Sequence, residues 1–312
     1  MTHSPKSPLI TILGATASGK TKLAVALAKA YHGEIISADS RQVYRYMDIG
    51  TGKDLEEYAE IPYHLIDVIH PRYEYSLFNF AQDFCTTFNH ISSRQHLPLL
   101  VGGTGMYLDA VLSRYKLTIA NIDENTRQEL EKKSDEALIS FLYALKPTLH
   151  NTTDIQDRSR ILKAIEIVLS ENEASATGKQ AFLEWPNFRS LILGIRIDRQ
   201  HLKERIKMRL KNRFEQGMID EVEMLIRKGI SFDRLNNFGL EYRYIARYLQ
   251  GQLTFNDMFQ KLNSEIVRFS KQQDKWFRNL EKKQHSIMWI DADESIEKNA
   301  ESLLQEFMDT FI

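Results

Sequence analysis

The chain has 312 residues, of which 43% are hydrophobic and 27% are charged, a composition typical of one large globular domain or of one domain with a sizeable insertion. No apolar run approaches the roughly 20 residues of a membrane helix, no signal peptide is evident, and Cys85 is the single cysteine, which together predict a cytoplasmic protein with no membrane segment and no intrachain disulfide. The formal net charge of −1 excludes a protein that coats nucleic acid indiscriminately, but it leaves room for a local basic face.

The first third of the chain alternates short apolar runs with helical patterns. The apolar runs predict strands at Leu9–Leu13, Glu34–Ser37, His64–Ile69 and Leu99–Val101. The helical patterns between them predict helices at Lys22–Tyr31, Leu77–Ser93 and Met106–Leu112. Strands separated by helices indicate βαβ units, and hence a parallel sheet that binds its ligands at the carboxyl ends of the strands.

Strand patterns disappear between about residues 121 and 182. Three helices are expected there, at Asp123–Lys133, Asp135–Leu145 and Asp157–Leu169. A polar, loop-like stretch then follows from Glu171 to Lys179. This pattern predicts a helical insertion domain at 116–189 within an α/β core made of 1–115 and 190–312.

The chain returns to a core pattern after the insertion and adds further helices. Two strands are expected, at Leu191–Ile197 and Ser286–Ile290. Four helices are expected, at Leu202–Phe214, Asp220–Lys228, Glu241–Leu249 and Thr254–Leu280. Thr254, followed three residues later by Asp257, is typical of a capping box. The predicted fold class is therefore a P-loop NTPase-like α/β fold, a parallel sheet flanked by helices, with a helical insertion and additional C-terminal helices.

The most specific motif is a phosphate-binding loop, which matches G-x-x-x-x-G-K-[ST] and lies between a predicted strand and a predicted helix. Its residues are Gly14, Ala15, Thr16, Ala17, Ser18, Gly19, Lys20 and Thr21. The glycines let backbone N–H groups and the helix dipole face phosphate oxygens. Lys20 is expected to neutralise the terminal phosphates, and Thr21 to hold Mg²⁺.

Most such loops bind ATP or another nucleoside triphosphate, so a small-molecule or nucleoside kinase is one interpretation of this motif. Asp67, which follows the apolar residues His64 to Ile66, is either the magnesium-binding acid of such a site or an ordinary strand-end residue. The loop by itself indicates a phosphorylated donor without identifying it.

Two more clusters follow predicted strands. Asp39 comes directly after the second strand, where its carboxylate either accepts a proton from a nucleophile or caps the residues from Ser40 onward. Thr104 lies among Gly102, Gly103 and Gly105. These glycines allow the backbone to approach a ligand closely, although Thr104 is equally interpretable as the N-cap of the next helix.

The helix predicted at Leu202–Phe214 carries Arg205, Arg209 and Arg213 at a spacing of four residues, beside an apolar ridge. Like charges at this spacing destabilise a helix by about 0.2–0.5 kcal/mol per pair. The row therefore indicates a nearby anion, either a diphosphate or a nucleic-acid backbone. A solvated charged face is the alternative.

Together these segments resemble one family, the tRNA dimethylallyltransferases, also called tRNA isopentenyltransferases. The matching segments occur in the family's order from residue 9 to about residue 280, and they read GATASGKT, ISADSRQVYRYMDIGTGK, YHLIDVIHPRYEYSLFNF, LPLLVGGTGMYLDAVL, RIKMRLKNRFEQGMIDEV and GLEYRYIARYLQG. The combination is far more specific than the phosphate loop alone. It favours the functional interpretations of Asp39 and Thr104.

The resemblance implies transfer of a dimethylallyl group from dimethylallyl diphosphate to N6 of the adenine 3′ of the anticodon. In that interpretation the loop holds the diphosphate, while Lys20, Arg209 and Mg²⁺ on Thr21 offset the charge of the departing diphosphate. Asp39 takes the N6 proton, and Thr104 helps to hold the adenine.

The resemblance also implies contact with the anticodon stem-loop of tRNA, with the target adenine out of its stack. The residues expected to contact tRNA are Asp39, Ser40, Arg41, Gln42, Thr104, Arg127, Ser159, Arg160 and Lys163. As isolated residues, Arg127 and Arg160 are more often solvated surface charges. A monomer is expected.

Two segments depart from the family's pattern. Residues 156–163 read QDRSRILK where the family has Asn-Asp-x-x-Arg-x-x-Arg, and residues 271–276 read KQQDKW where it has Lys-Arg-Gln-x-Thr-Trp. Because Lys cannot reproduce a bidentate Arg contact, Gln156, Lys163, Gln272 and Lys275 bear on tRNA affinity or choice and leave the donor site whole.

Two other functions compete with the tRNA prenyltransferase. A prenyltransferase acting on free adenine nucleotides needs no long clamp, so the helical insertion argues against it. A noncatalytic RNA-binding protein with a vestigial loop is disfavoured by the intact Lys20, Thr21 and Asp39.

Overall fold

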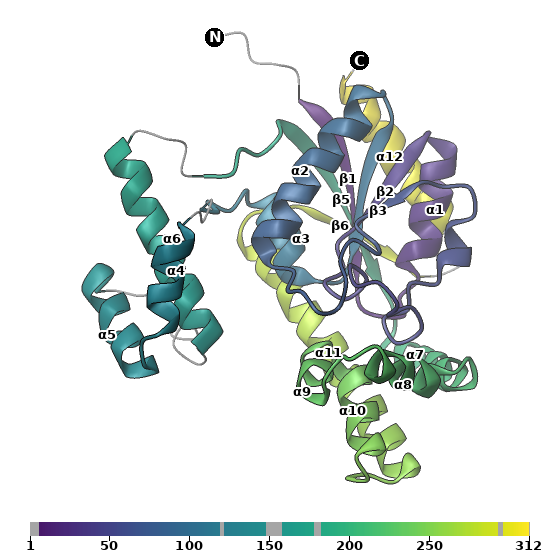
Figure 1. Cartoon of the computed structure of the whole chain (residues 1–312). Helices are drawn as coiled ribbons and strands as arrows, with labels where there is room; N and C mark the ends of the chain where they lie inside the picture. The colour runs from purple at the N-terminus through teal and green to yellow at the C-terminus, as the bar shows by residue number, and fades with distance from the viewer. Residues whose placement is uncertain (1–5, 119–121, 148–157, 178–181, 293–295, 312) are drawn as a thin grey trace. The chain divides into compact units, whose positions relative to one another are not determined.

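The structure is a computed structural model that describes residues 6–118, 122–147, 158–177, 182–292 and 296–311 (Figure 1). It divides into two compact units, which we call the core unit and the insertion unit. The core unit comprises Met1–Arg114 and Trp185–Ile312, and the insertion unit comprises Tyr115–Glu184. Within the described ranges, no helix has the length and apolar character needed to cross a bilayer.

The core unit is built on a six-stranded sheet in the order β3-β2-β4-β1-β5-β6, and every neighbouring pair is parallel. The strands are β1 (Ser7–Gly14), β2 (Gly33–Ser37), β3 (Tyr63–His64), β4 (Leu97–Gly102), β5 (Phe188–Arg196) and β6 (Ile287–Asp291). All residues of β2 and β4 are buried, as expected for parallel strands covered on both faces. The predicted parallel α/β sheet is confirmed.

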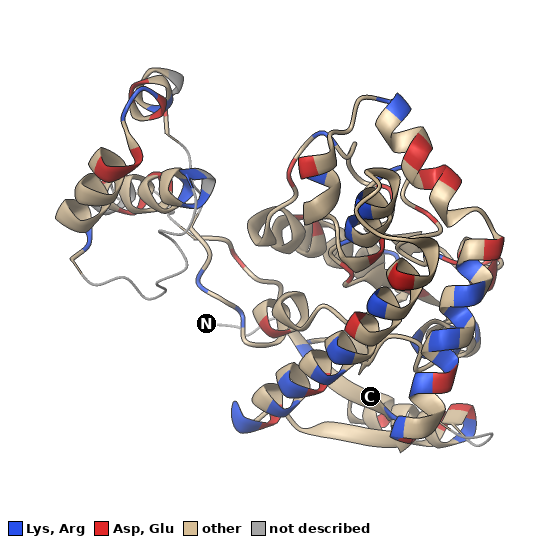
Figure 2. Ribbon diagram, turned by 90° about the horizontal axis from the view of Figure 1, so that it is seen from below, with Lys and Arg blue, Asp and Glu red and all other residues tan. Residues whose placement is uncertain are grey.

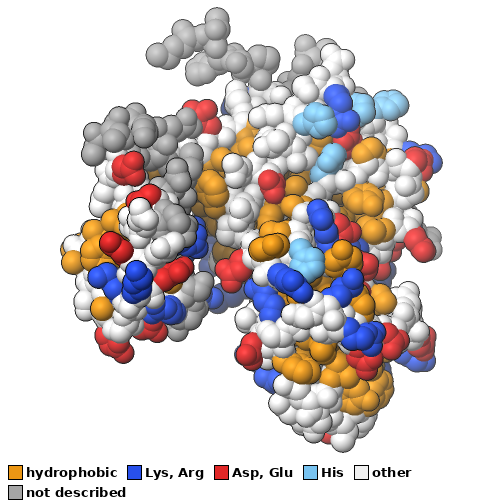
Figure 3. Space-filling model, in the orientation of Figure 1, with side chains coloured by type: hydrophobic (Ala, Val, Ile, Leu, Met, Phe, Trp, Pro, Cys, Tyr) orange, Lys and Arg blue, Asp and Glu red, His pale blue; other side chains and the backbone are white. Residues whose placement is uncertain are grey.

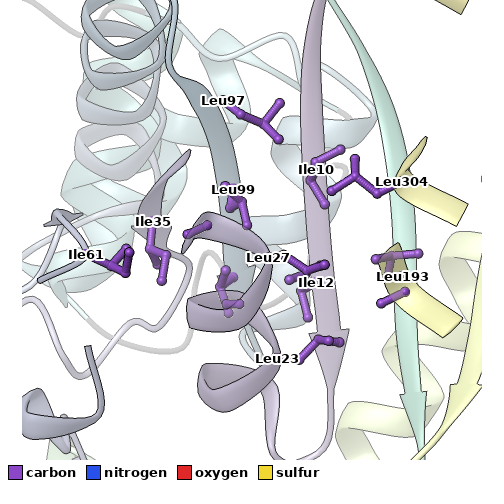
Figure 4. Packing of buried hydrophobic residues seen from close by; sticks show 14 of the residues in the cluster. Ile10, Ile12, Leu23, Leu27, Ile35, Ile61, Leu97, Leu99, Leu193 and Leu304 are labelled. Carbon is purple, nitrogen blue, oxygen red and sulfur yellow. The ribbon is translucent and has the colours of Figure 1, made fainter. Parts of the chain in front are cut away.

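Helices cover both faces of this sheet (Figure 1). One face carries α1 (Lys20–Ala30) and α12 (Ile296–Met308), and the other carries α2 (Leu77–Ser93), α3 (Gly105–Leu112) and α11 (Phe255–Lys282). Figure 4 shows Leu23 and Leu27 of α1 and Leu304 of α12 over Ile12 and Leu193 of the sheet. Two short 3₁₀ helices complete the unit, at Leu55–Tyr58 and Asp309–Phe311.

Four helices lie beyond the carboxyl ends of the strands (Figure 1). They are α7 (Arg199–Glu215), α8 (Met218–Arg227), α9 (Phe232–Asn237) and α10 (Leu240–Leu249). With the first half of α11 they form a second apolar core, which also takes in Val43 and Met47 from the loop after β2. These helices therefore lie where a parallel α/β sheet binds its ligands.

The described residues of the insertion unit form three helices, α4 (Glu124–Glu131), α5 (Asp135–Leu145) and α6 (Arg158–Thr177). They pack around an apolar cluster that includes Leu130, Leu142 and Ile165. Asp123 and Ser134 cap α4 and α5 by accepting backbone N–H groups. The three predicted helices are present, although the predicted start at Asp157 lies outside the described residues.

Some predicted boundaries were wrong. The strand predicted at His64–Ile69 ends at His64, because Leu65 and Asp67 adopt left-handed φ values of 61° and 56°. Beyond this bend the chain leaves the sheet and pairs with the loop after β2, where Ile69 donates to the Val43 carbonyl at 3.0 Å. The sequence pattern does not reveal such a bend, because the residues on both sides of it are apolar.

One helix is longer than predicted, and two helices were not predicted at all. The stretch from Glu171, predicted as a loop, is helical to Thr177 as part of α6. Helices α9 and α12 were not predicted. Thr254 caps α11 as predicted, because its hydroxyl accepts from the Asp257 N–H at 3.1 Å. The capping box is only half formed, because the Asp257 carboxylate accepts from the Thr254 hydroxyl at 2.7 Å instead of from its backbone N–H.

A buried carboxylate secures the β2 edge of the sheet. Glu34 accepts from Arg94 Nη2 at 2.8 Å and pairs with His64 Nε2 at 2.7 Å and His96 Nδ1 at 2.5 Å. Burial raises the pKa of Glu34, but the hydrogen bonds from His64, His96 and Arg94 outweigh it and hold the pKa below its usual 4.5. The ionised carboxylate therefore contributes stability above pH 4.5, and this contribution is lost as the pH falls through the lowered pKa.

Replacement of this carboxylate gives the first prediction. Glu34→Gln at neutral pH should destabilise the protein by about 1–3 kcal/mol, because it leaves buried donors without their charged acceptor. Thermal unfolding should show a melting temperature lower by roughly 2–12 °C, and the deficit should shrink in acid. Glu306→Gln on the exposed face of α12 is the matched control. Equal melting temperatures for the two variants would contradict the prediction.

Candidate active site

Three loops meet at the carboxyl edge of the sheet because β4 lies between β1 and β2. The loop after β2 is joined to β4 and its loop by two backbone hydrogen bonds, from Ala38 N to the Val101 carbonyl at 2.7 Å and from Thr104 N to the Ala38 carbonyl at 3.2 Å. Gly102 permits this approach, since a Cβ there would lie 2.2 Å from the Ala38 oxygen. Sheet order thus brings Asp39 and Thr104 beside the phosphate-binding loop.

The phosphate-binding loop has the expected strand–loop–helix context. Gly19 precedes α1 with φ of 97°, a left-handed conformation that favours glycine. Lys20 folds back over the loop and donates to the Ala15 carbonyl at 2.8 Å. Backbone N–H groups at such a turn and helix start form a concave site for anions.

Two partly buried cations, Lys20 and Arg209, lie at this loop. Arg209 of α7 donates to the Thr16 hydroxyl. Burial, and then the charge of Arg209, lower the pKa of Lys20 to about 8, partly offset by Asp39. Burial and Arg213 lower the pKa of Arg209 to about 10, so its guanidinium stays charged at neutral pH. An anion bound here would stabilise the charged forms of Lys20 and Arg209 and so raise the pKa of both groups.

The loop opens onto a cavity of about 420 Å³, which we call the phosphate-loop cavity. Its wall includes Lys20, Thr21 and Asp39, and α7 contributes Arg205 and Arg209. Of the predicted phosphate-binding loop, Thr16, Ala17, Gly19, Lys20 and Thr21 line this cavity, whereas Gly14, Ala15 and Ser18 do not.

A second cavity of about 420 Å³ adjoins the first, and we call it the Thr104 cavity. Thr16, Asp39 and Arg209 line both cavities. The Thr104 cavity also contains exposed aromatic and apolar side chains from two helices, namely Met106, Phe269 and Trp276.

Asp39 lies in the wall that the two cavities share. Its Oδ1 accepts from the Arg41 N–H at 2.9 Å, so the local capping interaction exists. No described residue donates a hydrogen bond to Oδ2, which leaves that oxygen able to accept a proton. The two interpretations of Asp39 are compatible.

Thr104 is held toward Asp39 rather than toward its own helix. It occupies the N-cap position of α3, but its side chain makes no capping hydrogen bond. Instead its Oγ1 accepts from the Ser40 N–H at 3.1 Å. The hydroxyl therefore lies beside the residue that follows Asp39.

The oxygen groups of the phosphate-loop cavity fit a magnesium ion. Mg²⁺ is usually bound by one or two protein oxygens, with substrate phosphates and waters completing its shell. The Thr21 hydroxyl and the Asp39 carboxylate both line this cavity. The described residues include no cluster of three or more acidic, His or Cys side chains suited to a metal, so further ligands would come from phosphate and water.

Asp67, the other candidate magnesium ligand, has a different environment. The buried ammonium of Lys53 donates to its carboxylate and also to Asp48 Oδ1 and the Tyr44 carbonyl. Asp67 lines neither cavity. Its position supports the structural interpretation.

The residues predicted to contact tRNA are distributed over both units. In the core unit, Ser40 and Arg41 line the Thr104 cavity. Gln42 lines the phosphate-loop cavity instead, with its amide bonded to Ser37 and to the Gly52 carbonyl. Gln272 lines the Thr104 cavity, whereas Lys275 does not.

The insertion unit holds the remaining predicted contacts. Arg127 of α4 and Lys163 of α6 lie 3.7 Å and 3.1 Å from the Glu166 carboxylate. Ser159 lies in the first turn of α6, and Arg160 beside it is exposed. Gln156 lies outside the described residues. On the face seen in Figure 3, acidic and basic side chains are interspersed on both units, consistent with the net charge of −1.

Sequence reasoning missed Gln273, a buried residue of α11 that lines both cavities. Its Oε1 accepts from the Thr16 N–H at 2.8 Å, and its Nε2 donates to the Gly103 carbonyl at 2.9 Å. It therefore ties the phosphate-binding loop to the loop after β4. The sequence does contain an indication of this role, because Gln273 is a polar residue within the apolar face that Ile266, Phe277 and Leu280 form on this helix.

A second missed residue is Glu221 of α8. Its carboxylate accepts from the N–H groups of Asp48, Ile49 and Gly50 at 2.7, 2.7 and 3.0 Å, and from the Tyr242 hydroxyl at 2.7 Å. These bonds fix the loop that carries Thr51 into the walls of both cavities. A glutamate in a helix gives no local indication of such a role.

Fold and loop together define an α/β protein of the P-loop type. The family model described as IPP transferase matches residues 42–280, and the model described as isopentenyl transferase matches residues 8–61. The protein named tRNA dimethylallyltransferase 1 of Geotalea uraniireducens (strain Rf4) is 51% identical over 95% of this chain and 97% of its own length. The protein of the same name from Hahella chejuensis (strain KCTC 2396) is 45% identical over 97% of this chain and 98% of its own.

Solved structures agree with this assignment. The full-length tRNA isopentenylpyrophosphate transferase of Bacillus halodurans is 33% identical, with a TM-score of 0.70 over 98% of this chain and 99% of that chain. A eukaryotic dimethylallyltransferase acting on tRNA is 21% identical and shares the fold, with a TM-score of 0.78 over 98% of this chain and 80% of that chain. The chain belongs to the IPP transferase family, as its sequence motifs predicted.

The pKa of Lys20 gives the second prediction. Because this pKa is lowered to about 8, the free protein loses the lysine charge as the pH rises through that value. Affinity for a diphosphate ester, measured by calorimetry, should therefore fall above pH 8 by up to about tenfold per pH unit. The Lys20→Arg variant keeps its charge over this range and should show no such fall. Parallel pH profiles for the two proteins would refute the prediction.

Proposed function

We propose that the protein transfers the dimethylallyl group from dimethylallyl diphosphate to N6 of the adenine 3′ of the anticodon in tRNA, releasing diphosphate. The observation that carries the proposal is the position of Asp39 in the wall shared by the phosphate-loop cavity and the Thr104 cavity. One carboxylate can thus meet both a donor and an acceptor. The relatives named tRNA dimethylallyltransferase match nearly the whole chain.

The phosphate-loop cavity suits the donor. The backbone N–H groups of residues 14–21 and the charges of Lys20 and Arg209 are placed to bind the diphosphate and to stabilise its charge as it leaves. A magnesium ion held by Thr21, with Asp39 within the same wall, would supply additional charge neutralisation on the phosphate oxygens. The prenyl carbon C1 would then point toward the Thr104 cavity.

The Thr104 cavity suits the acceptor. An adenine that has left its stack can lie against the aromatic and apolar side chains there, with the Thr104 hydroxyl available to one of its polar atoms. The N6 lone pair attacks C1, the C1–O bond breaks, and its electron pair leaves with the diphosphate. Oδ2 of Asp39 accepts the proton that N6 loses and later releases it to solvent.

The insertion unit favours a tRNA over a free nucleotide as the acceptor. A mononucleotide needs only the cavity, whereas an anticodon stem offers phosphates to the basic residues Arg127, Arg160 and Lys163. The intact loop and Asp39 also favour an enzyme over a binding protein. A kinase is disfavoured by Asp67, which is paired with Lys53 instead of lining a cavity.

The third prediction concerns the reaction itself and is tested by incubating the protein with labelled dimethylallyl diphosphate and Mg²⁺. Label should enter an unmodified tRNA that carries adenine 3′ of the anticodon, and mass spectrometry should find a prenylated adenosine at that position. AMP in place of tRNA should accept little or no label, and ATP should not be consumed. Absence of label from RNA treated with folded protein would refute the proposal.

Replacement of Asp39 gives the fourth prediction. Asp39→Asn should slow prenyl transfer by about 10²–10⁴-fold, because the amide cannot accept the N6 proton. Binding of tRNA, measured by fluorescence anisotropy, should change little. Asp233→Asn, at an exposed position of α9, is the matched control. Near-normal transfer by Asp39→Asn would show that the Asp39 carboxylate is not the proton acceptor.

A further inference from the structure

Within the part of the chain that the structure describes, Arg213 is a buried cation with a single long ion pair and an unpaired Nε. It lies one helical turn after Arg209 on α7, and only 5% of the residue is exposed. The nearest carboxylate oxygen, Oε1 of Glu241, is 3.8 Å from Nη1, beyond hydrogen-bond distance. Its Nε is buried and has no hydrogen-bond partner among the described residues.

Such an environment is unusual for arginine. A guanidinium has five N–H donors, and buried polar groups are nearly always hydrogen-bonded. A desolvated cation also costs free energy unless an anion offsets it. Arg209 lies close enough for its pKa to be lowered by the charge of Arg213, so the two arginines repel each other. Among the described residues, Glu241 is the one carboxylate within 4 Å of Arg213, so the guanidinium retains donors for an anion from outside the chain.

The position of Arg213 indicates where that anion binds. Arg213 lines the Thr104 cavity and not the phosphate-loop cavity, whereas Arg205 lines only the latter and Arg209 lines both. The guanidinium packs against the backbone of Gly52, where a Cβ would lie 1.5 Å from Nη2. Gly52 lines the phosphate-loop cavity, whereas its neighbour Thr51 lines both cavities.

The charges around the Thr104 cavity favour an anionic ligand. Its wall carries four arginines and two carboxylates, contributed by Asp39, Arg41, Arg209, Arg213, Glu241 and Arg243. A neutral adenine base alone would not balance this net charge of +2. In Figure 2, Lys and Arg recur along the long helix α11 together with Asp and Glu, but the residues that this helix contributes to the wall are uncharged.

We infer that Arg213 is part of a phosphate subsite in the Thr104 cavity, which binds a phosphodiester of the acceptor RNA next to the target adenine. This inference rests on the proposed function, because it assumes that the Thr104 cavity receives RNA. The row of three arginines on α7 is then divided between two anions. Arg205 and Arg209 serve the diphosphate donor, and Arg213 serves the RNA backbone.

Removal of the charge provides the fifth prediction. With Arg213→Gln, affinity for an unmodified anticodon stem-loop RNA should fall by about 10–100-fold, as expected for the loss of a charged hydrogen-bonded contact. The slope of log affinity against log salt concentration should become shallower by about 0.7–0.9, the value for one phosphate contact. Arg213→Lys should keep the slope and recover part of the affinity. Lys207→Gln on the exposed face of α7 is the matched control for the change in net charge.

Three further readouts separate this role from its alternatives. In the absence of RNA, the melting temperature of Arg213→Gln should stay close to that of the wild type, because the loss of the long ion pair with Glu241 is offset by the removal of a buried charge. The KM for dimethylallyl diphosphate should stay unchanged. At saturating RNA, kcat should stay within about threefold of the wild type, because the lost contact contributes to binding and not to the chemical step.

Each contrary result has a definite meaning. An unchanged salt slope would overturn the inference, whatever the affinity. A raised KM for dimethylallyl diphosphate with normal RNA affinity would assign the subsite to the diphosphate and would overturn it as well. If the wild type itself neither binds nor modifies tRNA, the proposed function fails, whereas a wild-type-like Arg213→Gln in a working assay refutes only the phosphate subsite.

Discussion

The site depends on the order of the strands in one parallel sheet. With β4 hydrogen-bonded between β1 and β2, the three segments that follow these strands must leave the sheet side by side. The first forms the phosphate-binding loop, the second carries Asp39, and the third carries Thr104. Close contact between the last two requires a residue without a side chain at Gly102. Donor and acceptor chemistry are thereby brought to one edge.

The C-terminal helices supply the remaining walls of the two cavities at the sheet edge. Helix α7 supplies the arginines, and α11 supplies Gln273, which connects the phosphate-binding loop with the loop after β4. Helix α8 holds the loop around Thr51 through Glu221. Because these polar bonds are buried or partly buried, each resists displacement of the cavity walls. The additional helices are therefore structural parts of the site and not appendages to it.

Electrostatic strain at the site is consistent with its proposed ligands. Lys20 and Arg209 have lowered pKa values, and Arg213 is buried with one long ion pair. Burying cations in this way costs stability in the free protein, and the cost is recovered only when anions bind. Natural proteins commonly accept such a loss of stability where function requires it. The buried charge at Glu34, which is fully paired, shows how the same fold treats a charge that has only a structural role.

The sequence by itself determined the parallel α/β class, the family and the phosphate-binding loop, and it predicted roles for Asp39 and Thr104. These features are encoded in short stretches, where hydrophobic period and glycine spacing directly reflect local structure. Only the tertiary structure decided that the predicted strand ends at His64, that Asp67 pairs with Lys53, and that Gln273 and Glu221 shape the cavities. Gln273 contacts a residue 257 positions away, and a contact over such a distance leaves no pattern in the neighbouring residues. The partners of a polar side chain are set by the packing of the whole chain, because burial and hydrogen-bond geometry exist only once the elements have assembled.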